Sequence, residues 1–261
     1  MKIKERISVF AKYRHLLEQL VITDIKLKYR RSFLGYLWSV LNPLLIMVVM
    51  SVVFTAMFKR TIPHFPVYLL VGNLLFSYMR ESTSHSISAI TSHSALLKMT
   101  YIPKYMFVLS KVISDFVNLL FSLVALIIVM FATGVNFTKF FPLIIIPLAE
   151  LFIFCLGLSM FLSQAAVFFR DIQYIWGVVC TAWMYLTPIF YAVDTLPDNI
   201  RWFIMRFNPM FYYVTLFRDY TWQGHRAWEQ NIIRGGICSV FTLIIGVILF
   251  MKNKDKLILY I

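Results

Sequence analysis

The chain has little charge. Only 14% of its 261 residues are Asp, Glu, Lys or Arg, whereas 60% are hydrophobic and the mean hydropathy is +0.76. Soluble domains carry about 25% charged residues. The chain therefore has too few charges to cover a water-facing surface. This excludes an ordinary soluble enzyme, a disordered protein and a disulfide-rich secreted module.

Patterns that carry cofactor or metal chemistry are also missing. The three cysteines lie singly in apolar stretches, so neither a disulfide framework nor a zinc site is indicated. None of the nine glycines belongs to a GxxxxGK[ST] phosphate loop, and there is no HExxH or GxSxG motif. We expect no metal, no cofactor and no catalytic group in this chain. If the protein uses ATP, another chain must bind it.

Acidic residues are scarcer than basic ones, at 12 against 25, which leaves a net charge of +13. A basic excess is typical of nucleic-acid binders and of membrane proteins with charged loops. Apolar runs of about 20 residues decide for the membrane, and we expect no nucleic-acid partner. The predicted fold is an all-α polytopic membrane protein with six spans, at residues 36–58, 67–88, 105–133, 140–169, 174–191 and 232–251.

The segments outside these spans have their own patterns. In residues 1–35, apolar positions recur at near-helical spacing between basic ones, which favours an amphipathic helix in the membrane interface. A soluble helix packed on a partner is the alternative. Residues 89–100 are predicted to form a short cytoplasmic helix, and residues 196–220 hold two pieces too short to span, which indicates a re-entrant hairpin. Residues 252–261 form a basic tail.

Loop charges give the orientation. The N-terminal segment, the stretch 80–104, Arg170 and the tail together hold 16 of the 25 basic residues, against seven on the other side. Basic loops stay in the cytoplasm. Six spans then leave both termini cytoplasmic.

Polar residues within the second span form one predicted stripe. Asn73, Ser77, Arg80 or Glu81, Ser84 and Ser88 follow one another at steps of three or four. Because such a stripe cannot face lipid cheaply, we expect it to face a cavity. A hydrogen-bonded seam with another helix is the alternative, and Arg80 with Glu81 would then mark the end of the span.

Ionisable residues occur in or beside later spans. Lys111 and Asp115 in the third span are four residues apart, so they are predicted to form a neutral pair. Glu150 lies inside the fourth span with no basic neighbour in sequence. Arg170 and Asp171 close that span, and a salt-bridged turn is the favoured interpretation. Pro188 should break the fifth span near its outer end.

Four passages together resemble a known family. They are ITDIKLKYRRSFLGYLWSVLNPLL (22–45), LLKMTYIPKYMFVLSKVISD (96–115), VFFRDIQYIWGVV with YLTPIFY (167–179 and 185–191), and RFNPMFYYV (206–214). In this order and spacing they resemble ABC-2-type export permeases. More narrowly they are similar to the branch that exports lipid-linked polysaccharides: O-antigen, capsule, teichoic acid and cell-wall rhamnan.

The resemblance implies a bacterial cytoplasmic (inner) membrane protein that forms a homodimer. It implies two copies of a separate cytoplasmic ATPase, which bind ATP and Mg. The substrate would be a polysaccharide on an undecaprenyl-type phosphate lipid. The interfacial helix would be residues 3–22, the coupling helix 89–100 and the outward-facing hairpin 196–220.

Residue roles follow as expectations. Aromatic and polar side chains would line the sugar path: Trp176, Trp183, Tyr185, Phe190, Tyr191, Tyr212, Tyr213, Asn73, Ser77 and Glu81. Packing and membrane-interface roles are the alternative for these aromatics. Cations would receive the lipid phosphate or simply anchor the first span: Lys26, Lys28, Arg30 and Arg31. Coupling to the ATPase would use Ala95, Leu96, Lys98, Met99 and Pro103.

Two other functions compete. A polytopic enzyme acting on isoprenoid-linked sugars needs clustered acids or histidines, and the five histidines are dispersed. An ABC-2 exporter of a small drug or lipid is harder to separate. The aromatic hairpin and the LGYLWSVLNP passage favour a polymer.

Overall fold

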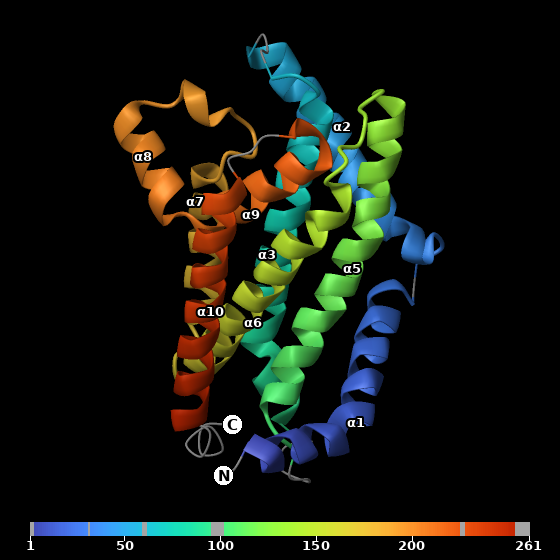
Figure 1. The fold of residues 1–261 in the computed structure, drawn as a ribbon. Coiled ribbons are helices and arrows are strands. Elements are labelled where there is room, and N and C mark those ends of the chain that lie inside the picture. Colours follow the sequence, from blue (N-terminus) through green and yellow to red (C-terminus); the bar gives the residue numbers. More distant parts are fainter. Residues whose placement is uncertain (1–2, 31, 59–61, 95–101, 225–227, 254–261) are drawn as a thin grey trace.

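The computed structural model describes residues 3–30, 32–58, 62–94, 102–224 and 228–253. Every regular element in these ranges is helical, and most of the helices run nearly side by side along one long bundle (Figure 1). This confirms the all-helical fold class. The α-helices are α1 (Ile3–Tyr29), α2 (Trp38–Phe58), α3 (Phe65–Ser92), α5 (Tyr105–Ala132), α6 (Ile145–Phe168), α7 (Ile172–Leu186), α8 (Asp198–Phe207), α9 (Pro209–Arg218) and α10 (Trp228–Asn253).

Four stretches are long and apolar enough to cross a membrane. They are Gly35–Phe54, Tyr105–Ala132, Phe141–Phe168 and Gln230–Asn253. The predicted second span corresponds to α3, which has 28 residues but a more polar sequence. The predicted fifth span corresponds to α7, which has only 15 residues and is short for a hydrocarbon core of about 30 Å. The chain is thus a multi-pass membrane protein with four clear spans in its described part.

Two predicted boundaries differ from the observed ones. Helix α7 ends at Leu186 rather than at residue 191, because the chain turns extended at Thr187, directly before Pro188. Helix α3 continues to Ser92, so the first residues of the predicted coupling helix belong to α3. Residues 95–101 lie outside the described part, and with them Ala95, Leu96, Lys98 and Met99.

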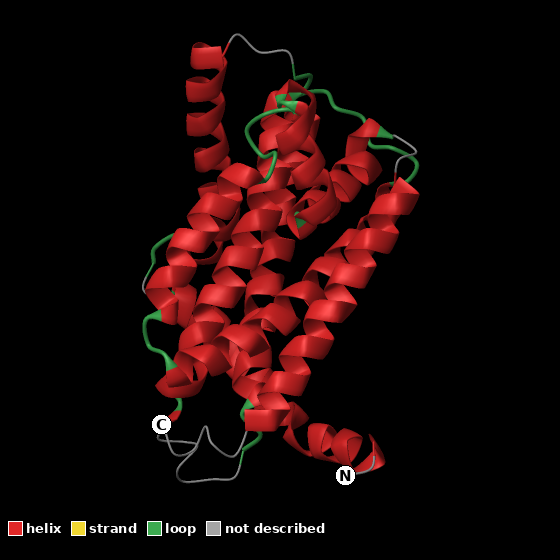
Figure 2. Ribbon diagram, turned by 90° about the vertical axis from the view of Figure 1, so that its left-hand side faces the viewer, coloured by secondary structure: helices red, strands yellow, loops and turns green. Residues whose placement is uncertain are grey.

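The N-terminal helix is longer than the predicted interfacial helix. The first turns of α1 cross the end of the bundle, and the helix then turns and runs along α5 (Figures 1 and 2). It ends at Tyr29, and α2 begins at Trp38 beside the middle of α5, where the Ser122 hydroxyl donates to the Ser39 carbonyl oxygen at 2.9 Å.

This path places Trp38 far from the first residue of α5. At 1.5 Å per residue, Ser122 lies about 25 Å along α5 from that residue. Trp38 therefore lies well along the bundle. The end of α1 occupies the space that a longer first span would have filled.

Helix α3 is the centre of the bundle and packs against α2, α5, α6, α7 and α9. Many of its apolar side chains are fully buried, among them Val67, Leu69, Leu70 and Met79. This burial explains how a helix with a polar sequence is held inside a membrane bundle: its apolar face packs on protein, so its polar positions need not face lipid.

Helices α6 and α10 approach each other more closely than side chains would allow. A Cβ on Gly157 would lie 2.5 Å from backbone atoms of Leu243, and a Cβ on Gly246 would lie 2.2 Å from the Gly157 carbonyl oxygen. Small residues permit such close backbone contact between membrane helices. These two glycines therefore set the distance between α6 and α10.

Replacing Gly246 by Ala should force the two backbones apart. We expect a loss of about 1–3 kcal/mol of stability, the usual cost of overpacking, and a lower melting temperature in detergent. Gly177→Ala on α7 is the matched control, since nothing lies within 4 Å of its Cβ position. Equal melting temperatures for Gly246→Ala and wild type would contradict this packing.

Candidate functional site

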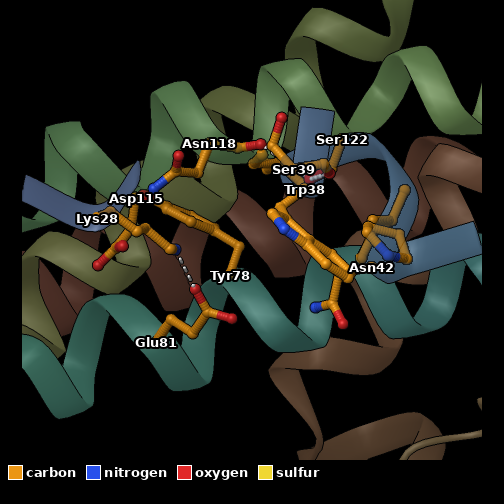
Figure 3. A pocket seen from close by; sticks show the side chains of 12 residues that line it. Lys28, Trp38, Ser39, Asn42, Tyr78, Glu81, Asp115, Asn118 and Ser122 are labelled. Carbon is orange, nitrogen blue, oxygen red and sulfur yellow. Dashed lines mark hydrogen bonds and ion pairs between the residues drawn. The ribbon is translucent and has the colours of Figure 1, made fainter. Parts of the chain in front are cut away.

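A polar pocket lies where α1 ends and α2 begins, between α3 and α5. Figure 3 shows Tyr78 and Glu81 on α3 facing Asp115 and Asn118 on α5. Polar side chains inside a membrane bundle are costly and mark functional sites. The lining residues are Lys28, Trp38, Ser39, Asn42, Pro43, Leu74, Tyr78, Glu81, Asp115, Asn118, Leu119 and Ser122.

Ion pairs join α1 to the two helices behind it. The Lys28 ammonium donates to Glu81 of α3 at 3.1 Å, and the Lys111 ammonium of α5 donates to Asp24 at 2.6 Å. Each pair is formed by residues more than 50 positions apart in the sequence. Both pairs are partly exposed, at 38% for Lys28 and Glu81, 22% for Lys111 and 19% for Asp24, and together they join the end of α1 to α3 and α5.

The predicted pair of Lys111 with Asp115 is wrong. Lys111 binds Asp24, and Asp115 is buried and contacts the His85 ring nitrogen Nδ1 at 2.8 Å. Residues four apart lie on one helix face, but α1 and α3 pack against that face and offer closer partners. The prediction considered only neighbours within one helix.

The basic segment divides between surface and pocket. Lys26 and Arg30 are exposed, Lys28 lines the pocket, and Arg31 lies outside the described residues. Of the cations predicted to receive a phosphate, Lys28 therefore lines the pocket, and Lys26 and Arg30 lie near it at the end of α1.

The predicted polar stripe of α3 divides in the same way. Glu81 faces the pocket, whereas Asn73 and Ser77 are partly buried and do not line it. Arg80, Ser84 and Ser88 are exposed and continue the stripe beyond Ser77. Two faces of α3 are therefore polar: one forms the pocket and one is open along the side of the subunit.

Most of the aromatic residues predicted to line a path are packing residues instead. Tyr213 is fully buried and hydrogen-bonds Ser239 at 2.7 Å, and Tyr212 is 2% exposed and donates to the Arg206 carbonyl oxygen at 2.6 Å. Trp176 is buried and its indole N–H donates to Thr83 at 2.9 Å. These side chains offer no ring face to a passing substrate in this subunit.

The remaining aromatic candidates lie nearer the surface. The Trp183 indole donates to Asn208 at 2.8 Å and is partly buried, and Phe190 is buried and stacks on Phe54 at 5.1 Å. Tyr185 is 61% exposed, and Tyr191 is partly exposed. Of the predicted aromatic path residues, Tyr185 alone presents most of its ring to the outside.

Two further predicted ionic sites have structural surroundings. Glu150 is buried against α10, where a Cβ on Gly235 would lie 2.5 Å from its Oε2 atom. Arg170 and Asp171 are exposed in the turn between α6 and α7 and form no ion pair with any described residue, so the predicted salt bridge is wrong. The turn is closed instead by the Ile172 amide, which donates to the Phe169 carbonyl oxygen at 3.2 Å.

Sequence reasoning missed Arg218 of α9. Its buried guanidinium donates to the Pro188 and Tyr68 carbonyl oxygens, each at 2.9 Å, and lies 3.4 Å from the centre of the Tyr68 ring. Its partners are 30 and 150 residues away. The only available signal was an arginine in an otherwise apolar helix. Arg218 joins α3, α9 and the segment after α7 at the far end of the bundle from the termini.

The chain is similar to known proteins over most of its length. It matches the ABC-2 type transporter family over residues 15–222, which is well over half of its length. The chain belongs to the ABC-2 type transporter family. This confirms the prediction of a membrane transport subunit rather than a polytopic enzyme.

Relatives of this ABC-2 permease match it from end to end. The O-antigen export system permease protein RfbA of Myxococcus xanthus is 33% identical over 94% of each chain. The protein of the same name in Klebsiella pneumoniae is 27% identical over 95% of this chain and 98% of its own. The polysialic acid transport protein KpsM of Escherichia coli is 20% identical over 96% and 98%.

Replacing Arg218 by Lys should loosen the outer end of the bundle. A lysine lacks the planar fork and cannot keep both carbonyl bonds and the ring contact. We expect a loss of about 2 kcal/mol, the scale of one charged hydrogen bond, and a lower melting temperature. Arg206→Lys on the exposed side of α8 should have little effect. An equal effect of the two substitutions would contradict the clamp.

Proposed function

We propose that the chain is the membrane-spanning subunit of an ATP-driven exporter of a lipid-linked polysaccharide. The observation that carries this proposal is the end-to-end match to permeases named for O-antigen and polysialic acid export. A homodimer with two copies of a cytoplasmic ATPase would form the transporter. The substrate would be a polymer on an undecaprenyl-type phosphate lipid in the bacterial cytoplasmic membrane.

We infer six membrane passes, formed by α2, α3, α5, α6, α7 and α10. The described ends of α1 and α10 lie at the same end of the bundle (Figure 1), which is consistent with an even number of passes. The excess of basic residues on that side supports a cytoplasmic location for both termini. Helices α8 and α9, of ten residues each, would form the re-entrant hairpin on the outer side.

Substrate entry would use the cations at the end of α1. A pyrophosphate lipid needs positive charge where its head meets the protein. Lys26 and Arg30 are exposed, and Lys28 lies next to them, bound to Glu81. A phosphate bound by Lys26 and Arg30 would lie beside the Lys28–Glu81 pair. The polar side chains of α3, including Asn73 and Ser77, would lead outward from there, past Tyr185 on α7.

Coupling to the ATPase would pass through residues 95–101 into α5. Pro103 lies just before α5, and its carbonyl oxygen accepts from the Met106 amide at 2.9 Å in the first turn. A push on the preceding segment would therefore reach α5 directly. Helix α5 carries Lys111, Asp115 and Asn118, so the same push would reach the pocket.

Deleting the gene in its native host tests the function. We expect the surface polysaccharide to disappear and its lipid-linked form to accumulate inside the cell, with both restored by the wild-type gene. A second test is co-purification with an ATPase. Unchanged surface polysaccharide, or transport activity without ATP, would overturn the proposal.

Reversing the charge at Lys98 tests the coupling. Lys98→Glu should leave ATP hydrolysis by the reconstituted complex largely intact but reduce export per ATP several-fold. The reason is that the coupling segment would no longer fit the ATPase. Lys252→Glu, in the last turn of α10, is the control. Normal export by the Lys98 variant would count against this coupling site.

A further inference from the structure

We propose that the pocket between α1, α2, α3 and α5 binds one sugar ring of the exported glycan. This rests on the proposed function and adds a subsite in which only Glu81 had been predicted to line the sugar path. The site is built from Trp38, Asn42, Tyr78, Glu81 and Asn118. These residues combine an aromatic ring face with amide, phenol and carboxylate groups that can form hydrogen bonds. A sugar ring is recognised by this combination.

The Tyr78 hydroxyl is the strongest sign of a ligand. Tyr78 is 3% exposed, and its hydroxyl has no hydrogen-bond partner among the described residues. Leaving a buried hydroxyl unsatisfied is costly. The ring is held by an edge contact to Phe116 at 5.6 Å, and Phe116 is held in turn by Phe152 at 5.2 Å. The hydroxyl is therefore kept in one position at the pocket, ready for a partner that the protein does not supply.

The charges of the pocket favour hydroxyl groups over a phosphate. Its lining has two carboxylates, Glu81 and Asp115, and one ammonium, Lys28, which is already bound to Glu81. A second negative charge placed among them would be repelled. Sugar hydroxyls instead donate to carboxylate and amide oxygens, and they accept from amide and phenol groups. Asn42 and Asn118 supply those amides.

Trp38 supplies the apolar face. Its side chain is 39% exposed at the start of α2, so part of the indole is open to a ligand. The C–H face of a sugar can pack on such a ring, and its hydroxyls then meet the polar groups of α3 and α5. Lys28 lies in the same pocket, so a phosphate bound by the end of α1 would lie next to this sugar.

The test uses the purified permease–ATPase complex in nanodiscs and two probes. One probe is undecaprenyl pyrophosphate. The other is the undecaprenyl-pyrophosphate-linked glycan extracted from the host. Tyr78→Phe should weaken binding of the glycan probe about 5- to 10-fold, the value of one hydrogen bond. It should leave binding of undecaprenyl pyrophosphate unchanged. Trp38→Ala should also weaken glycan binding, and Trp38→Phe should restore most of it.

A stability measurement separates binding from folding. Because the Tyr78 hydroxyl has no partner in the part of the chain that the structure describes, Tyr78→Phe should not lower the melting temperature. Tyr174→Phe, an exposed tyrosine of α7 outside the pocket, is the matched control and should bind both probes normally.

Each outcome decides between the possibilities. Glycan binding that is unchanged in Tyr78→Phe and Trp38→Ala would overturn the sugar subsite. Equal weakening of both probes would also overturn it, and would assign the pocket to the lipid phosphate. Equal affinity of the wild-type complex for the two probes would overturn the subsite but leave the proposed function standing. If the wild-type complex binds neither probe, the proposed function fails as well.

Discussion

The place where α1 ends at Tyr29 and α2 begins at Trp38 is the constraint on which the rest of the structure depends. In hydrocarbon every polar group must be satisfied within the protein. Since the end of α1 packs along α5, it brings Asp24 and Lys28, both partly exposed, against the neighbouring helices. Lys111 of α5 pairs with Asp24 at 2.6 Å, and Glu81 of α3 pairs with Lys28 at 3.1 Å. The pocket forms around these pairs because polar residues are stable there only when they have polar partners.

Different interactions hold the frame of the bundle and the surroundings of the pocket. At the outer end, Arg218 fixes α3, α9 and the segment after α7 through charged hydrogen bonds. Farther along the bundle, Gly157 and Gly246 hold α6 against α10 without intervening side chains. These contacts are short and leave little freedom. Around the pocket, by contrast, the pairs are partly exposed and can exchange partners. A transporter needs both: a rigid frame to transmit force, and a polar site where substrate can replace internal contacts.

Features that depend on local sequence pattern, such as apolar runs and proline positions, could be predicted from the sequence. The apolar runs indicated α2, α5, α6 and α10, and Pro188 correctly placed the break after α7. Local pattern could not show that α1 enters the bundle, because its partners Glu81 and Lys111 are 53 and 87 residues from the side chains they bind. For the same reason the sequence wrongly predicted that Lys111 pairs with Asp115, although Lys111 binds Asp24. Tyr212 and Tyr213 were predicted to line the sugar path but are buried. Composition reveals an aromatic segment but not which of its rings are buried. Tyr78 carried no sequence signal, because an unpartnered hydroxyl exists only in three dimensions.

The central claim is that the pocket between α1, α2, α3 and α5 binds a sugar of the exported glycan. It is tested most directly by photo-crosslinking in cells that make the polysaccharide, with benzoyl-phenylalanine in place of Trp38 and, separately, of Val49 on the exposed face of α2. The account predicts adducts at position 38 that carry glycan and are shortened by a glycosidase, and adducts with phospholipid alone at position 49. Phospholipid adducts alone at both positions would contradict it.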